Sequence, residues 1–152
     1  MFDAARWSQL ISGHACPLCS EPGSPERRVV ELPSGPAFLQ DDAAFRGYCI
    51  LVHRRHVTEL HQLSPEELRD WATDVARLAR AIAAVCHPAK LNYEVLGNEV
   101  PHLHCHVVPR YANDGCWGRP IWLRPREERR ALPPGECQAL RDALRQQFTP
   151  DD

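Results

Sequence analysis

The chain has 152 residues and a formal net charge of −2, with 43% hydrophobic and 25% charged residues. This length fits a single domain over residues 1–152 with a substantial core, and the composition is typical of a globular protein. A near-neutral charge argues against a dedicated nucleic-acid partner, and no apolar stretch approaches the length of a membrane span, so neither partner is expected.

The first seven residues include acidic and aromatic side chains and no apolar signal core, so we expect a cytoplasmic protein. Thiols stay reduced in that compartment, and an odd number of cysteines cannot all pair. Cys16 and Cys19 have the spacing of a metal-binding pair. The other five are expected to be small buried hydrophobic residues: Cys49, Cys86, Cys105, Cys116 and Cys137.

The predicted elements begin with a short helix over residues 3–11, followed by a loop-like knuckle over residues 13–19. Two extended runs follow, over residues 28–32 and 37–40. A run of four turn-forming residues separates them, Pro33-Ser34-Gly35-Pro36, and this pattern predicts a hairpin. A third strand is predicted over residues 48–53.

The clearest helix prediction covers residues 65–87. Ser64 is the expected N-cap, Pro65 stands at the first helical position, and Glu67 completes a capping box. Apolar residues then recur at three- and four-residue steps and form one stripe: Leu68, Trp71, Val75, Leu78, Ile82 and Val85.

Strands over residues 91–96 and 102–111 and a helix over residues 135–148 complete the prediction. Strands and helices do not alternate as repeated β-α-β units. The pattern therefore favours an α+β fold, in which helices pack on an antiparallel sheet of about five strands, with one long helix and shorter terminal helices.

The most informative segment is His102-Leu103-His104-Cys105-His106. Residues two apart share one face of a strand, so the three histidines are expected on one side and Leu103 and Cys105 on the other. At ~3.3 Å per residue, His102 and His106 lie roughly 13 Å apart, too far to share one metal ion without a sharp bend. Separate roles for the histidines are therefore favoured.

This run resembles the signature of the histidine triad (HIT) superfamily of nucleotide hydrolases and transferases. Two other segments are similar to that family: the glycine, apolar strand, basic pair and histidine of residues 47–56, and the asparagine-bearing strand of residues 91–98. The resemblance covers about residues 16–112 and leaves residues 113–152 as a C-terminal extension. It implies a HIT-like fold and a homodimer, which is common in the family.

The resemblance also implies a mechanism in which His104 attacks the α-phosphorus of a nucleotide and forms a covalent nucleotidyl-histidine intermediate. Neutral imidazole is nucleophilic near pH 7, and a covalent intermediate divides the reaction into two displacements. His106 is expected to act in catalysis and contact the phosphate oxygens, Asn98 to bind the phosphate, and Asp41 to bind the ribose.

The expected activity is that of a phosphohydrolase acting on dinucleoside polyphosphates or related nucleotide conjugates. A nucleotidyltransferase that uses the same histidine and a slow nucleotide-binding module are the alternatives. Two residues depart from the family pattern. Many members have a histidine directly after the glycine at Gly47, where this chain has Tyr48, and Glu99 replaces a common serine before the triad. A carboxylate at that position would repel a phosphate if it pointed inward.

A lone Cys16/Cys19 pair fits half of a tetrahedral zinc site, a redox pair or two buried thiols. A redox role lacks the β-α-β context that it requires. Zinc-binding HIT proteins complete such a site with the histidine after the basic pair and the first triad histidine, which implies His56 and His102 and a structural Zn²⁺. A catalytic ion among the three triad histidines is the competing hypothesis.

Further contacts are expected downstream of the triad. Arg110 would face a phosphate or form an exposed salt bridge. Trp117 and Trp122 would cover the site or form a dimer contact. The mixed-charge run over residues 124–130 is expected to be a solvated surface.

Overall fold

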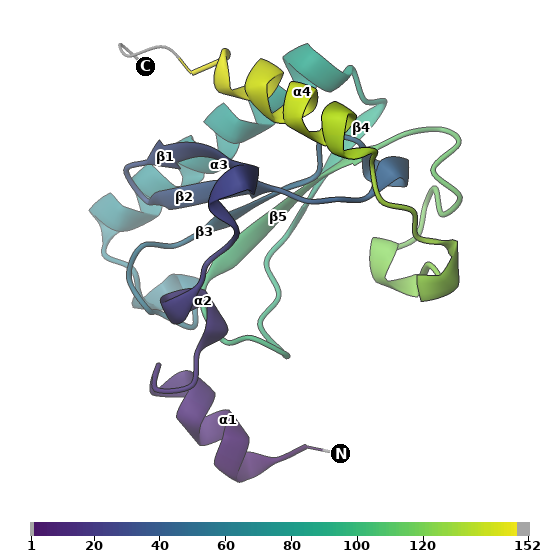
Figure 1. The fold of residues 1–152 in the computed structure, drawn as a ribbon. Coiled ribbons are helices and arrows are strands. Elements are labelled where there is room, and N and C mark those ends of the chain that lie inside the picture. The colour runs from purple at the N-terminus through teal and green to yellow at the C-terminus, as the bar shows by residue number, and fades with distance from the viewer. Residues whose placement is uncertain (1, 149–152) are drawn as a thin grey trace.

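A computed structural model describes residues 2–148 of the protein. Within these residues, one antiparallel sheet has the strand order β1-β2-β3-β5-β4, and four α-helices accompany it (Figure 1). This architecture confirms the α+β fold and the five strands expected from the sequence. In the part of the chain that the structure describes, no helix has both the length and the apolar character needed to cross a membrane.

The hairpin of β1 (Arg28–Leu32) and β2 (Gly35–Leu39) is tighter than the sequence predicted. Gly35 begins β2 instead of standing in the turn. It has a φ of 150°, and a Cβ there would lie 2.0 Å from a carbonyl oxygen of the next strand, so glycine permits this close approach. Ser34 donates hydrogen bonds from its backbone N–H and its hydroxyl to the buried carboxylate of Asp74 at 2.8 and 2.7 Å, which attaches the turn to the long helix.

The centre of the sheet is formed by β3 (Cys49–Val52) and β5 (His104–Arg110), and β4 (Lys90–Glu94) pairs with the other side of β5. The last strand is two residues shorter at its start than predicted. His102 lies before the strand. Its ring donates to the carbonyl oxygen of His53 at 2.8 Å, so the chain at His102 lies beside the loop that comes after β3.

The long helix α3 (Pro65–Cys86) confirms the predicted capping box: the Ser64 hydroxyl accepts from the Glu67 N–H, and the Glu67 carboxylate accepts from the Ser64 N–H. His87 ends the helix with a left-handed backbone, φ 48°. Most of the predicted stripe is buried or partly buried, but Leu68 in the first turn is 43% exposed. The C-terminal helix α4 (Pro134–Arg145) packs against β1 and α3.

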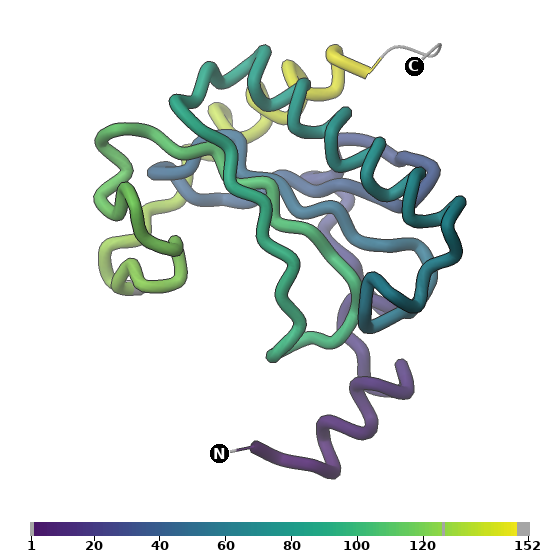
Figure 2. Tube along the Cα trace, turned by 180° about the vertical axis from the view of Figure 1, so that it is seen from behind, coloured from purple at the N-terminus to yellow at the C-terminus, as the bar shows by residue number. Residues whose placement is uncertain are grey.

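The two faces of the sheet have different surroundings. Cys49, Leu51, Cys105 and Val107 of the central strands belong to the core that α3 completes. Figure 1 shows α3 behind the sheet, and Figure 2, seen from the other side, shows it in front. Alternate residues of the same strands point away from this helix, and this second face carries His104 and His106.

At the N-terminus, α1 (Ala4–Ile11) is capped by the Asp3 carboxylate and projects away from the sheet (Figure 1). Its buried residue is Leu10. The predicted knuckle contains one helical turn, α2 (Pro17–Ser20).

Candidate active site and metal centre

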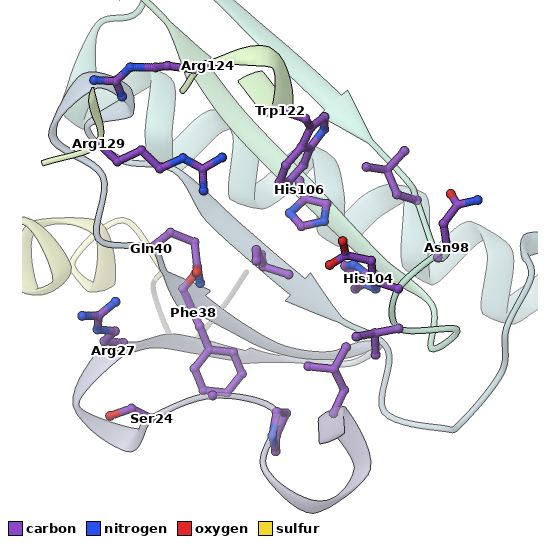
Figure 3. Close-up of a pocket in the computed structure, with 18 residues that line it drawn as sticks. Ser24, Arg27, Phe38, Gln40, Asn98, His104, His106, Trp122, Arg124 and Arg129 are labelled. Carbon is purple, nitrogen blue, oxygen red and sulfur yellow. The ribbon is translucent and has the colours of Figure 1, made fainter. Parts of the chain in front are cut away.

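His104 is the first residue of β5 and is 8% exposed. Its Nδ1 lies 2.6 Å from the carbonyl oxygen of His102. A carbonyl oxygen only accepts, so Nδ1 must carry a proton, and in the neutral ring Nε2 keeps its lone pair. The ring lines a pocket on the face of the sheet opposite α3 (Figure 3). An unprotonated imidazole nitrogen in such a pocket can act as a nucleophile.

His106 lies two residues further along β5, on the same face. Its ring centroid is 4.7 Å from that of His104, with the rings nearly perpendicular at 76°. Burial, followed by the proximity of His104, lowers the pKa of His106 to about 4. The Tyr48 hydroxyl lies 2.6 Å from its Nδ1. The ring is therefore neutral at pH 7 and held in one orientation.

The pocket around the two histidines has a volume of about 1000 Å³, at the upper end of the range for ligand sites. Phe38 and Ile50 supply part of its apolar wall, and Gln40 and Asn98 supply amide groups (Figure 3). Glu99, which stands where many family members have a serine, also lines the pocket.

Three arginines line the same pocket, and sequence reasoning missed them as site residues. Arg27 forms an ion pair with Asp41 at 2.9 Å, and Arg124 forms one with Asp42 at 3.1 Å. The side chain of Arg129 forms no ion pair and no hydrogen bond among the residues whose side chains the structure describes. The run over residues 124–130 is thus partly a pocket wall (Figure 3). No local pattern identifies these arginines, because about 100 residues separate Arg27 from the other two.

Asp41 uses both carboxylate oxygens within the fold. One accepts from Arg27, and the other accepts from the backbone N–H of Leu132 at 2.6 Å. Among the described residues that line the pocket, Arg27 is present and Asp41 is not.

Trp122, Trp117 and Arg110 were each considered as site residues, and the structure places them in three different surroundings. Trp122 covers one side of His106, with ring centroids 5.0 Å apart, and its indole N–H donates to Glu94. Trp117 lines a separate surface hollow. Arg110 neither faces the pocket nor forms an exposed salt bridge. It is 3% exposed and donates to Asp114 at 2.7 Å, which anchors the following loop.

A second cluster lies beside the start of β5 and joins Cys16 and Cys19 to His56 and His102, as the sequence analysis expected. One ligand atom from each residue lies within 4.8 Å of the other three. Three separations between a cysteine sulfur and a histidine Nδ1 are 3.3 to 3.5 Å, and the two Nδ1 atoms are 3.3 Å apart. Tetrahedral zinc with ordinary Zn–S and Zn–N bonds requires roughly 3.3–3.8 Å between ligand atoms.

The outer hydrogen bonds of the two histidines also fit a metal ion. His56 donates from Nε2 to the carbonyl oxygen of Ile11, and His102 donates from Nε2 to that of His53, both at 2.8 Å. Each ring therefore directs an unprotonated Nδ1 towards the cysteines, as in metal sites with oriented imidazoles. The cluster could bind a metal ion, and its chemistry suits zinc.

Fold and site together define an α+β protein with a pair of buried histidines in a pocket and a Cys₂His₂ cluster beside it. The chain belongs to the HIT domain family, whose model matches residues 21–113. The family resemblance stated from the sequence is thereby confirmed. The match includes Arg27 but ends before Trp122, Arg124 and Arg129 of the pocket wall.

Characterised relatives include nucleotide hydrolases. The bis(5'-nucleosyl)-tetraphosphatase of Schizosaccharomyces pombe is 30% identical over 83 residues, which are 51% of this chain and 46% of that enzyme. The adenosine 5'-monophosphoramidase of Saccharomyces cerevisiae is 27% identical over 99 residues, which are 63% of each chain. The alignments thus span less than two thirds of either enzyme.

Solved structures show the same fold. A histidine triad protein from Bradyrhizobium japonicum has a TM-score of 0.73 and 30% identity, covering 80% of this chain and 91% of that one. A Zn-bound histidine triad family protein from Mycobacterium smegmatis has a TM-score of 0.56 and 25% identity, covering 93% of both chains.

Proposed function

We propose that this protein is a nucleotide hydrolase that cleaves at the α-phosphate of dinucleoside polyphosphates or related nucleotide conjugates. The observation that carries the proposal is the orientation of His104, whose Nδ1 proton is held by a carbonyl oxygen while Nε2 is left unprotonated in the pocket. The hydrolase relatives support the same chemistry.

The reaction proceeds in two displacements. In the first, the lone pair of His104 Nε2 forms a bond to the α-phosphorus, and the bond from phosphorus to the leaving group breaks. The leaving group keeps that electron pair and takes up a proton where its basicity requires one. In the second, water forms an O–P bond, the N–P bond breaks, and Nε2 regains its lone pair as a proton is released.

Charge that develops on the phosphate oxygens needs donors in fixed positions. His106 donates from Nε2 and Asn98 offers its side-chain amide. Arg129 supplies a positive charge that has no carboxylate partner among the described residues (Figure 3). For Asp41 to bind the ribose, one carboxylate oxygen would exchange its present partner for a ribose hydroxyl.

The Cys₂His₂ cluster is proposed to hold a structural Zn²⁺. Four protein ligands close a tetrahedral shell, so no position remains for water or substrate, and the ion would stabilise the fold without entering the reaction. It would join the N-terminal knuckle to the loops that precede α3 and β5.

A homodimer is also proposed, with β4 at the interface. In the described sheet β4 is an edge strand. Tyr93 on β4, and Val95 and Leu96 just after it, are 42–51% exposed, and such an edge is suited to pairing with a second chain.

The nucleophile is tested by incubating the protein with nucleotides labelled at the α-phosphate and locating the label by mass spectrometry. We expect a nucleotidyl group on His104, and we expect His104→Ala to lower kcat by several orders of magnitude while nucleotide binding persists. His61→Ala, a change at an exposed histidine outside the pocket, serves as the matched control.

Comparable turnover by His104→Ala would contradict the assignment. Label that passes from His104 to an added acceptor, with little release to water, would identify a transferase. Binding without any labelling would identify a nucleotide-binding module.

A further inference from the structure

A buried phenol contacts the second pocket histidine at the position where many family members have a histidine. Tyr48 immediately precedes β3 and is 8% exposed. Its ring packs in a small core with Phe45 and Val108, and its hydroxyl lies 2.6 Å from Nδ1 of His106. The hydroxyl has no other hydrogen-bond partner among the described residues.

The direction of this hydrogen bond follows from the protonation of the two groups. Burial raises the pKa of Tyr48, and burial lowers the pKa of His106 to about 4, so at neutral pH the phenol is protonated and the imidazole is uncharged. The phenol hydrogen has one acceptor, the Nδ1 lone pair. In a neutral ring the proton must then sit on Nε2, the nitrogen left free for the pocket.

Among the residues that the structure describes, the groups around Tyr48 and His106 offer Nδ1 of His106 no competing hydrogen-bond partner. The ring of His104 and that of Trp122 both lie edge to face with the imidazole, and Trp122 donates to Glu94, which is paired with His106 across the strands. The charges of Glu94, Arg129 and Asp42 and the thiol of Cys49 act on Tyr48 from neighbouring elements.

We propose that Tyr48 is a positioning residue: its hydroxyl donates to His106 and fixes the tautomer in which His106 presents Nε2–H to the phosphate. This role rests on the proposed hydrolase function. The phenol stays protonated throughout the neutral range, so its hydroxyl remains a donor to His106 there.

The tautomer can be measured without substrate. Two-dimensional ¹H–¹⁵N NMR of the histidine rings, in the full-length zinc-loaded protein, distinguishes a protonated Nε2 from a protonated Nδ1. We expect His106 to be protonated on Nε2 in the wild type and to show a mixture of tautomers in Tyr48→Phe, which removes only the hydroxyl.

The catalytic consequence is measured with a dinucleoside polyphosphate as substrate. We expect Tyr48→Phe to lower kcat by about tenfold and to change KM little, because the donor matters most as charge develops on the phosphate. Tyr48→His, which restores an N–H donor, should recover part of kcat. The matched control is Tyr111→Phe, which removes a phenol that donates to backbone carbonyls of Arg46 and Cys86 and should leave kcat unchanged.

The outcomes separate the positioning role from the proposed function. An active wild type whose His106 is protonated on Nδ1 would overturn the positioning role alone. The role is also overturned if Tyr48→Phe folds and changes neither the tautomer nor kcat. A wild type with the expected tautomer but no hydrolysis of any nucleotide conjugate would contradict the proposed function, and the positioning role with it.

Discussion

The three triad histidines differ in which ring nitrogen is engaged by a hydrogen bond within the fold and in whether that nitrogen donates or accepts. His102 donates from Nε2 to a carbonyl oxygen and so directs Nδ1 towards the cysteines. His104 donates from Nδ1 and so directs Nε2 into the pocket. In the proposed mechanism, His106 accepts from Tyr48 on Nδ1 and keeps Nε2–H for the phosphate. The hydrogen-bond partner of each ring, more than its place in the motif, determines its chemistry.

Arg129 provides a test of substrate recognition at this scale. We expect Arg129→Gln to raise KM for a dinucleoside polyphosphate by about tenfold, because the change removes a positive charge that no described carboxylate offsets. The dependence of KM on salt should weaken as well. Steady-state kinetics at two ionic strengths measure both effects.

The control is Arg69→Gln, on the exposed face of α3, which should leave KM unchanged. An unchanged KM in Arg129→Gln would show that this arginine does not contact the substrate.

At the scale of elements, segments far apart in the chain build the site. β5 supplies the histidines, the segment before β1 supplies Arg27, and the short 3₁₀ segment Ile121–Leu123 supplies Trp122. The family match ends at residue 113, so the wall formed by Trp122, Arg124 and Arg129 belongs to the C-terminal extension. Features of substrate choice that are particular to this chain are expected to depend on this wall.

The Cys₂His₂ cluster is also an element-scale feature, because it connects α2 to the loops that contain His56 and His102. We expect removal of zinc by a chelator to lower the melting temperature by several degrees and to expose the N-terminal segment to proteolysis. Cys16→Ser should reproduce both effects, whereas Cys137→Ser, at a half-buried cysteine outside the cluster, should not. Calorimetry and limited proteolysis measure these changes.

The competing hypothesis of a catalytic ion predicts a different result. A chelated protein that stays fully folded but inactive, and that regains activity with zinc, would show that the ion takes part in the reaction.

At the scale of the whole molecule, the two faces of the sheet carry different features. One face packs against α3 and carries the apolar core, and the opposite face is free to form the pocket (Figures 1 and 2). The single-residue alternation of β5 assigns its side chains to the two faces.

The exposed edge strand β4 leads to a prediction about the oligomeric state. We expect the protein to sediment as a homodimer and Val95→Glu to shift it towards the monomer, because a charge in a buried apolar interface is costly. Leu68→Glu, at an equally exposed apolar residue on α3, is the control and should leave the dimer intact. Analytical ultracentrifugation measures the change, and a wild type that sediments as a monomer would contradict the proposal.

The sequence by itself determined the features that depend on short-range periodicity. The capping box and apolar stripe predicted α3, turn residues predicted the hairpin, and alternation in the triad predicted the shared face of His104 and His106. The spacing of Cys16 and Cys19 marked them as a metal-binding pair, but His56 and His102 were added only through resemblance to a family, because residues 16 and 102 have no local relation.

Only the tertiary structure decided which side chains complete the pocket and how they are paired. Ion pairing with Asp41 and Asp42 distinguishes Arg27 and Arg124 from Arg129, and the contact between Tyr48 and His106 spans 58 residues. Such pairings depend on strand order and on the path of loops. These arise when the whole chain folds around its core, and no window of the sequence contains them.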